Sequence, residues 1–268
     1  MTLLISWIGV DDKKEGKAVA SLYIASDSRY SWGDSSSYDY GIKVFGCSQF
    51  PDIFGFCGDV SFPSIVLGQL ISQIDSGIMF SAFDDTQLKN EKIFEYMRTS
   101  LKSYPKDRLT GGSFTILHGS RYGKKFSCFK TTFDEKAGLK NIEVQLPLIS
   151  TKICSEGSGK EDFDSNFHSW LDKRSNNFRT SRGVYHCLVK TLNETKDIGT
   201  GGLPQIMGLY MNRNARLFGI IEGDKKYIYG KESSGDINSY IIEWRNENFE
   251  RMDPSTLKLL PGAQRQPS

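Results

Sequence analysis

Segments with the spacing of strands and segments with the spacing of helices occur in blocks along this chain, and this grouping restricts its fold more than any other feature. Strands come first, then two helices, then strands, two more helices and a last group of strands. In a doubly wound parallel sheet, by contrast, strands and helices alternate one by one. The order therefore predicts an α+β fold in which layered antiparallel sheets carry helices on their outer faces.

The individual elements follow from the spacing of apolar residues and from the turn-forming residues between them. The expected strands cover residues 2–9, 18–26, 42–46, 53–57, 113–118, 126–133, 148–154, 205–211, 216–222 and 226–229. The expected helices cover residues 64–76, 90–104, 163–171, 185–192 and 238–252. The charged stretch 10–17 is expected to be a hairpin connection, and the Ser-, Gly- and Asp-rich stretch 32–40 a loop. We expect one domain over residues 1–230 and a C-terminal extension over 231–268, with a helix and a frayed tail.

Charge and composition exclude several classes of protein. The chain has 34 Lys and Arg against 32 Asp and Glu, a net charge of +2, which argues against a nucleic-acid-binding protein that relies on bulk charge. No apolar run approaches the roughly 18–20 residues of a membrane-spanning helix. The first residues lack the basic and long apolar regions of a signal peptide. We therefore expect a cytoplasmic protein with no membrane partner, and its 5 widely spread cysteines are expected to be reduced and buried.

The sequence shows no pattern for a metal or a cofactor. His118, His168 and His186 are far apart and lack the short spacings of metal ligands. Residues 111–113 (Gly-Gly-Ser) precede an expected strand, whereas a phosphate-binding loop precedes a helix. We therefore expect neither a metal nor a cofactor.

Three residues near the start of the chain are candidates for a catalytic role. Thr2 follows Met1, and removal of Met1 would leave Thr2 with a free α-amine, whose pKa near 8 suits a base for its own hydroxyl. Asp27 follows the second expected strand. Lys43 lies in a short apolar strand, where burial is unfavourable unless a carboxylate pairs with it. Each residue alone also has an ordinary explanation: a common second residue, a solvated turn and a lysine at a sheet edge.

Taken together, these residues resemble the proteasome β-subunit family of N-terminal nucleophile (Ntn) hydrolases. That family has a nucleophilic Thr on its first strand, an Asp in an (A/V)-x-D-S-R turn and a Lys in a K-V or K-I step. Here the turn reads Ala25-Ser26-Asp27-Ser28-Arg29, the step reads Lys43-Val44, and the spacing from Asp to Lys equals the family's. Further along, Phe56-Cys57-Gly58, Gly157-Ser158-Gly159 and the stretch from Asp197 to Gly202 match family motifs. The resemblance extends from Thr2 to about residue 230, with Lys160 in place of a serine found in most active members.

The resemblance implies a four-layer αββα sandwich and the activity of a threonine-type endopeptidase. It implies that Thr2 is the nucleophile, that Lys43 and Asp27 act on its hydroxyl, and that the Gly58 N–H binds the oxyanion. Ser158 and Asp197 would position the amine and a water. The substrate side chain would enter a pocket formed by Tyr30, Gly41, Phe45 and Phe56, which contributes no charge, so small or medium apolar residues are expected there.

The resemblance also implies partners: a peptide or unfolded protein as substrate, further copies of the chain in a ring or stacked rings, and room for an ATP-dependent unfoldase. Two other functions remain open at this stage. One is a catalytically silent structural subunit with the same fold. The other is an Ntn amidase that hydrolyses a small amide.

Overall fold

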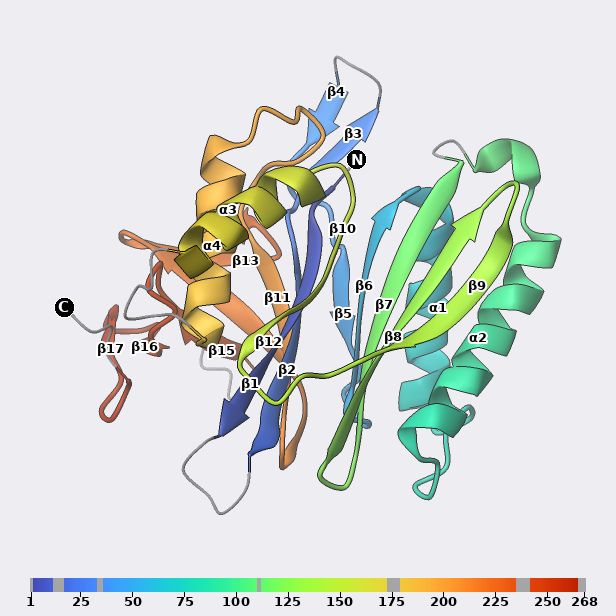
Figure 1. The fold of residues 1–268 in the computed structure, drawn as a ribbon, viewed down its shortest axis with the longest axis horizontal. Helices are drawn as coiled ribbons and strands as arrows, with labels where there is room; N and C mark the ends of the chain where they lie inside the picture. The colour runs from blue at the N-terminus through green and yellow to red at the C-terminus, as the bar shows by residue number, and fades with distance from the viewer. Residues whose placement is uncertain are drawn as a thin grey trace.

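The fold is described from a computed structural model for residues 2–11, 17–32, 36–109, 112–172, 179–234 and 242–264. These residues form a mixed α/β structure with two large sheets and four α-helices (Figure 1). The blocks expected from the sequence are present, because both large sheets are built mainly from antiparallel neighbours.

The larger sheet has eight strands in the order β10-β1-β2-β11-β12-β13-β14, and β15 pairs in parallel with β12. Its strands are β1 (Leu4–Asp11), β2 (Ala18–Ser26), β10 (Thr151–Glu156), β11 (Gln205–Tyr210), β12 (Arg213–Glu222), β13 (Lys225–Ile228), β14 (Lys231–Glu232) and β15 (Ile242–Arg245). The second sheet has five strands in sequence order: β5 (Val44–Gly46), β6 (Asp52–Gly58), β7 (Ser113–Tyr122), β8 (Lys125–Asp134) and β9 (Gly138–Val144).

The helices lie on the outer sides of the two sheets. The five-stranded sheet is covered by α1 (Ser61–Asp75) and α2 (Thr86–Ser103), followed by the short 3-10 helix η1 (Lys106–Arg108). The eight-stranded sheet is covered by α3 (Lys160–Asp172) and α4 (Ser181–Glu194). In Figure 1 the two helix pairs therefore stand on opposite sides of the molecule, with the sheets between them.

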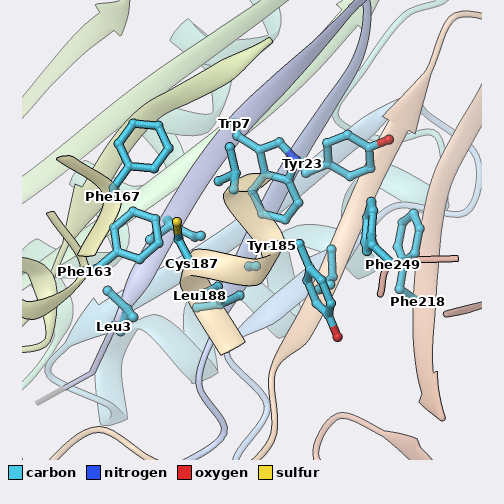
Figure 2. Close-up of a cluster of buried hydrophobic side chains, with 14 of the residues drawn as sticks. Leu3, Trp7, Tyr23, Phe163, Phe167, Tyr185, Cys187, Leu188, Phe218 and Phe249 are labelled. Carbon is cyan, nitrogen blue, oxygen red and sulfur yellow. The ribbon is translucent and has the colours of Figure 1, made fainter. Parts of the chain in front are cut away.

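Strand β1 shows why an almost unbroken apolar segment is needed in such a structure. Its residues alternate between the two faces of the sheet. Ile5 and Trp7 pack with the side chains of α3 and α4 (Figure 2), whereas Leu4 and Ile8 pack toward the five-stranded sheet. Since both faces are covered, both sets of side chains are apolar. The start of β1, next to Thr2, therefore has a buried apolar core on each of its two faces.

Several elements differ from the expectation. Within residues 32–40, expected to be a loop, Ser36–Tyr38 forms β4, which pairs with β3 (Tyr30–Trp32); residues 33–35 lie outside the described part. Strand β9 was not expected, because its apolar residues do not alternate regularly with the polar ones and all its residues are partly or fully exposed. The described part of 238–252 is not a helix: it contains β15 and the start of the small hairpin of β16 (Met252–Asp253) and β17 (Lys258–Leu259).

The helix expectation failed because pairing with β12 and burial of Trp244 stabilise an extended segment there. Phe249 also joins the core beneath α4, so this part of the chain packs on the main structure. The division at residue 230 stays a prediction. Residues 265–268 of the tail expected to be frayed, 261–268, and residues 12–16 of the expected hairpin connection lie outside the described residues.

Candidate active site

The ends of three strands bring Thr2, Asp27 and Lys43 together. Thr2 precedes β1, and the register that pairs Leu4 with Ser26 places the residue after β2 opposite the start of β1. Lys43 directly precedes β5 in the second sheet. The site therefore lies where the two sheets meet, and residues far apart in the sequence reach it from separate strands.

Lys43 joins the other two side chains. Its Nζ donates to Thr2 Oγ1 at 2.7 Å and to Asp27 Oδ1 at 2.9 Å. The side chains of Lys43 and Asp27 are both 0% exposed, so the pair is shielded from water. An ammonium group at this distance is able to polarise a hydroxyl, because a positive charge stabilises the alkoxide form of the oxygen.

Asp27 is held by the backbone around it. Its carboxylate accepts hydrogen bonds from the N–H groups of Leu3 at 2.9 Å, Arg29 at 3.1 Å and Gly201 at 3.1 Å. These donors come from the start of β1, from the turn after β2 and from the loop before β11. The charge of Asp27 is therefore compensated by three N–H groups in addition to Lys43, and the carboxylate has a fixed orientation.

Burial lowers the pKa of Lys43, while the charge of Asp27 and the hydrogen bond to it act in the opposite direction. The result is a pKa below the ordinary value for lysine. A buried ammonium of this kind loses its proton more readily than a solvated one.

A second polar group faces the backbone nitrogen of Thr2. That nitrogen donates to Ser158 Oγ at 3.1 Å, and Ser158 Oγ in turn donates to Asp197 Oδ2. Asp197 also accepts from Thr200 Oγ1 at 2.7 Å and from the Gly199 N–H at 3.0 Å. Burial alone would raise the pKa of Asp197, but these hydrogen bonds outweigh it and hold the pKa below its ordinary value. The carboxylate is thus available as an acceptor for Ser158.

Two glycines allow the chain before α3 to approach Thr2 closely. Gly157 has a φ of +95°, and a Cβ there would lie 2.0 Å from the carbonyl oxygen of Thr2. A Cβ at Gly159 would meet Thr200 Oγ1 at 2.9 Å, and the Gly159 N–H donates to the Thr2 carbonyl at 3.3 Å. The Gly-Ser-Gly motif therefore serves two purposes: its glycines provide space, and its serine contacts the Thr2 nitrogen.

Gln205 was not found by sequence reasoning, although it connects the parts of the site. Its Nε2 donates to the carbonyl oxygens of Asp27 at 3.1 Å and Gly41 at 2.7 Å. Its Oε1 accepts from the N–H groups of Lys43 at 2.9 Å and Val44 at 3.3 Å. The one signal in the sequence was a single glutamine at the start of an apolar run, and the structure shows that its side chain is buried. Gln205 fixes the distance between the Asp27 turn and the Lys43 backbone.

The four residues expected to form a substrate pocket lie together beside Lys43. The ring of Tyr30 lies against Gly41, where a Cβ would come within 2.4 Å of it, and the Tyr30 hydroxyl donates to the Ile42 carbonyl at 2.6 Å. The Lys43 Nζ lies 5.7 Å from the centre of the same ring. Phe56 contacts both Tyr30 and Phe45, with ring centres 6.5 Å and 6.3 Å apart. The three rings thus lie together where the substrate pocket was expected, and none of them carries a charge.

Gly58 ends β6 with a φ of +91°, and its backbone lies so close to β7 that a Cβ would meet the Ser113 carbonyl at 2.4 Å. The preceding residue, Cys57, lies beside Gly157, which places this end of β6 next to the Thr2 backbone. Burial raises the pKa of the Cys57 thiol to about 12, so this thiol stays protonated at neutral pH.

Within the described residues, no group of three or more His, Cys, Asp or Glu is placed to hold a metal ion. In the same part of the chain, no helix is long and apolar enough to cross a membrane. All five cysteines are free and buried, as expected from their spacing.

The arrangement of sheets and helices is a proteasome β-subunit-like fold. The protein called Anbu (ancestral beta-subunit) from Yersinia bercovieri is similar in structure, with a TM-score of 0.52, 11% sequence identity, and coverage of 80% of this chain and 82% of that chain. Eukaryotic HslV from Trypanosoma brucei gives a TM-score of 0.47 with 10% identity, over 77% of this chain and 99% of that chain. No protein-family model matches the sequence, and comparison with curated proteins finds no match. We base the fold assignment on the first structure.

Proposed function

We propose that the protein is a threonine-type peptidase of the Ntn-hydrolase class, built on a four-layer αββα sandwich and active through Thr2 once Met1 is removed. One observation carries the proposal: a fully buried Lys43 donates to both Thr2 Oγ1 and Asp27 Oδ1. A buried lysine–aspartate pair does not need a hydroxyl to be stable. Its contact with the hydroxyl of the second residue is explained by activation of that hydroxyl.

The reaction follows from the positions of the donors and acceptors. With Met1 removed, the nitrogen of Thr2 becomes an α-amine, and it accepts the proton of Oγ1 while Lys43 stabilises the oxygen that remains. Oγ1 bonds to the substrate carbonyl carbon, the C–N bond breaks, and the leaving amine takes the proton. Water then hydrolyses the acyl-enzyme. Ser158 and Asp197 orient the amine, and the Gly58 N–H is proposed to bind the oxyanion.

The proposed pocket limits the substrates. Tyr30, Phe45 and Phe56 offer no charge to pair with an ionised side chain, and their rings are proposed to narrow the pocket, so the proposal predicts cleavage after small or medium apolar residues. A fluorogenic peptide panel that varies only the residue before the cleaved bond tests this. Phe56→Ala should extend the range toward larger apolar residues, and a preference for Arg or Asp would contradict the pocket assignment.

The nucleophile is tested with intact-mass analysis and two variants. The active form should have a mass that lacks Met1 and should gain the mass of an epoxyketone or β-lactone probe on Thr2. Thr2→Ala should neither hydrolyse peptide nor take up the probe, whereas Thr2→Ser keeps a hydroxyl and should retain part of both. Hydrolysis by Thr2→Ala would refute the mechanism, and a wild-type protein without activity or labelling would favour a silent structural subunit.

A small amide is the second candidate substrate, because the Tyr30 ring lies close to both Gly41 and Lys43, where the substrate side chain is proposed to enter. Comparing peptide amides with short acyl amides at equal concentration separates the two activities. The amidase is favoured if only the short acyl amides are hydrolysed and Thr2→Ala abolishes that hydrolysis.

The proposal includes self-association of the chain in a ring or in stacked rings. It also includes a cytoplasmic location and hydrolysis of unfolded protein that an ATP-dependent unfoldase delivers. The support is an apolar group exposed on and beside the outer helices: Ile65 on α1 is 53% exposed, and Ile78 and Phe83 in the following loop are 76% and 86% exposed. Sedimentation of the wild type against Ile65→Asp tests it. A monomer at all micromolar concentrations would contradict the ring.

A further inference from the structure

An arginine-lined cavity opens at the end of the eight-stranded sheet opposite the candidate active site. It has a volume of about 440 Å³ and is bordered by β2, by β11, β12 and the turn between them, by β15, and by Arg251 just before β16. Gln205 stands at the active-site end of β11 and Tyr210 at the cavity end, five residues along the strand, or about 17 Å. The cavity is therefore separate from the Thr2 site.

Its lining has a marked excess of positive charge. Arg213, Arg216, Arg245 and Arg251 border the cavity, and Glu243 is the one carboxylate among the described lining residues. Arg213 and Arg251 are exposed and form no ion pair with a described residue. Arginines gathered around a hollow repel one another, and an anion placed among them relieves that repulsion.

A register irregularity directs two of these arginines to the same cavity. Gly208 pairs with Arg216 and Tyr210 pairs with Arg213, so between these pairs one residue of β11 stands opposite two of β12. In a regular strand, residues three apart point to opposite faces of the sheet. The extra residue changes the alternation, and both side chains border the cavity.

Arg245 forms a fixed wall of the cavity. Its guanidinium pairs with Glu243 and donates to the Phe249 carbonyl at 2.7 Å and to the Tyr210 hydroxyl at 3.3 Å. It also lies 4.6 Å from the centre of the Phe249 ring, and its side chain is 13% exposed. Arg245 is fixed in place by these contacts and therefore offers a ligand one preorganised cation. Arg213 and Arg251 face solvent, and their side chains are able to move into contact with the ligand.

From this geometry we propose that the cavity binds a compound with two or more linked phosphate groups. Arginine presents several N–H groups in one plane, which matches phosphate oxygens in pairs. The volume lies within the range of small-molecule sites, and Tyr210 and Met211 add an apolar border that can contact a nucleoside. The proposal is independent of the peptidase assignment.

Calorimetric titration of the full chain tests the proposal with tripolyphosphate, ATP and adenosine at low salt. We expect saturable binding of tripolyphosphate at one site per chain, no binding of adenosine, and weakening as salt increases. The double variant Arg213→Ala/Arg251→Ala should weaken binding at least 10-fold. Arg98→Ala/Arg108→Ala removes the same charge from α2 and η1, on the other side of the molecule, and should change binding less than 2-fold.

The source of the phosphate is read from the same titrations. Tighter binding of ATP than of tripolyphosphate shows that the nucleoside contacts the cavity as well, whereas binding of tripolyphosphate alone identifies an inorganic phosphate chain as the ligand. The proposal is overturned if neither compound binds up to 1 mM at low salt, about the weakest affinity of interest. It is also overturned if the two double variants lose affinity equally, or if adenosine binds as well as ATP.

Discussion

Replacing Lys43 by methionine should reduce both stability and activity, because it leaves the Asp27 carboxylate buried without its cation. Removal of one partner from a buried ion pair destabilises a protein by about 3–5 kcal/mol. The three backbone N–H groups that donate to Asp27 remain in the variant, so we expect the lower end, about 3 kcal/mol. With a urea m-value of about 3 kcal/mol/M, the unfolding midpoint falls by about 1 M. Hydrolysis should be lost, since Oγ1 of Thr2 no longer receives the Lys43 hydrogen bond.

The matched control is the other buried lysine pair. Lys89 Nζ lies 2.8 Å from Asp52 Oδ2, with side chains 3% and 0% exposed, and this pair lies between α2 and the five-stranded sheet. Lys89→Met should lower the urea midpoint by a similar amount yet retain kcat under conditions where the protein is folded. The double variant Asp27→Asn/Lys43→Met should recover part of the lost stability without activity. A Lys43→Met protein within about 1 kcal/mol of the wild type that still hydrolyses substrate would refute the reasoning.

Three further outcomes are expected. The Gly157→Ala variant should lose activity, because its Cβ would lie 2.0 Å from the Thr2 carbonyl oxygen. The control variant is Gly77→Ala, which is also at positive φ but has no atom within 4 Å of the added Cβ, and it should lose only stability. An equal kcat in the two variants would contradict the close approach of Gly157 to Thr2. The Gln205→Leu variant should lower the free energy of unfolding by about 1–3 kcal/mol for each buried partner left unpaired, as measured by urea unfolding. A decrease below about 1 kcal/mol would contradict the bridging role of Gln205. Burial would raise the pKa of Asp52, but hydrogen bonds from His118 and Lys89 hold this pKa below its ordinary value of 3.8. The stability that the ionised Asp52 contributes is therefore present above pH 3.8 and is lost as the pH falls below that value. The stability gap between wild type and Asp52→Asn should therefore narrow below that pH in thermal unfolding, and a constant gap would be inconsistent with the lowered pKa.

Much of the site was predictable because its residues stand at strand ends within short motifs. Thr2, Asp27 and Lys43 are each next to an apolar strand that can be read from the sequence, and the structure brings them within hydrogen-bonding distance. Their chemical roles stay predictions. Gln205 escaped because its signal is one polar residue before an apolar run, and its partners lie more than 160 residues away in the chain.

The parts of the fold that were not predicted are those stabilised by distant neighbours. Strand β9 is a half-exposed edge strand whose polar residues lack a clear alternation, and it forms by pairing with β8. Strand β15 is four residues long and pairs with β12, an element more than 20 residues earlier, with Trp244 packed against Gly219. Local propensity cannot show such pairings, because the partner strand provides most of the stabilisation.

The hydrogen bonds to the backbone of Thr2 bear on whether the chain folds before or after Met1 is removed. They use the peptide nitrogen and the carbonyl oxygen of Thr2, two atoms that are present whether or not another residue precedes it. Under the proposed mechanism, folding and activation are therefore expected to be separate events: the chain folds before Met1 is removed, and removal of Met1 starts catalysis. A purification tag fused to that end is then expected to give a folded but inactive protein, so a test of the proposal requires the tag at the other end or a protease that leaves Thr2 first.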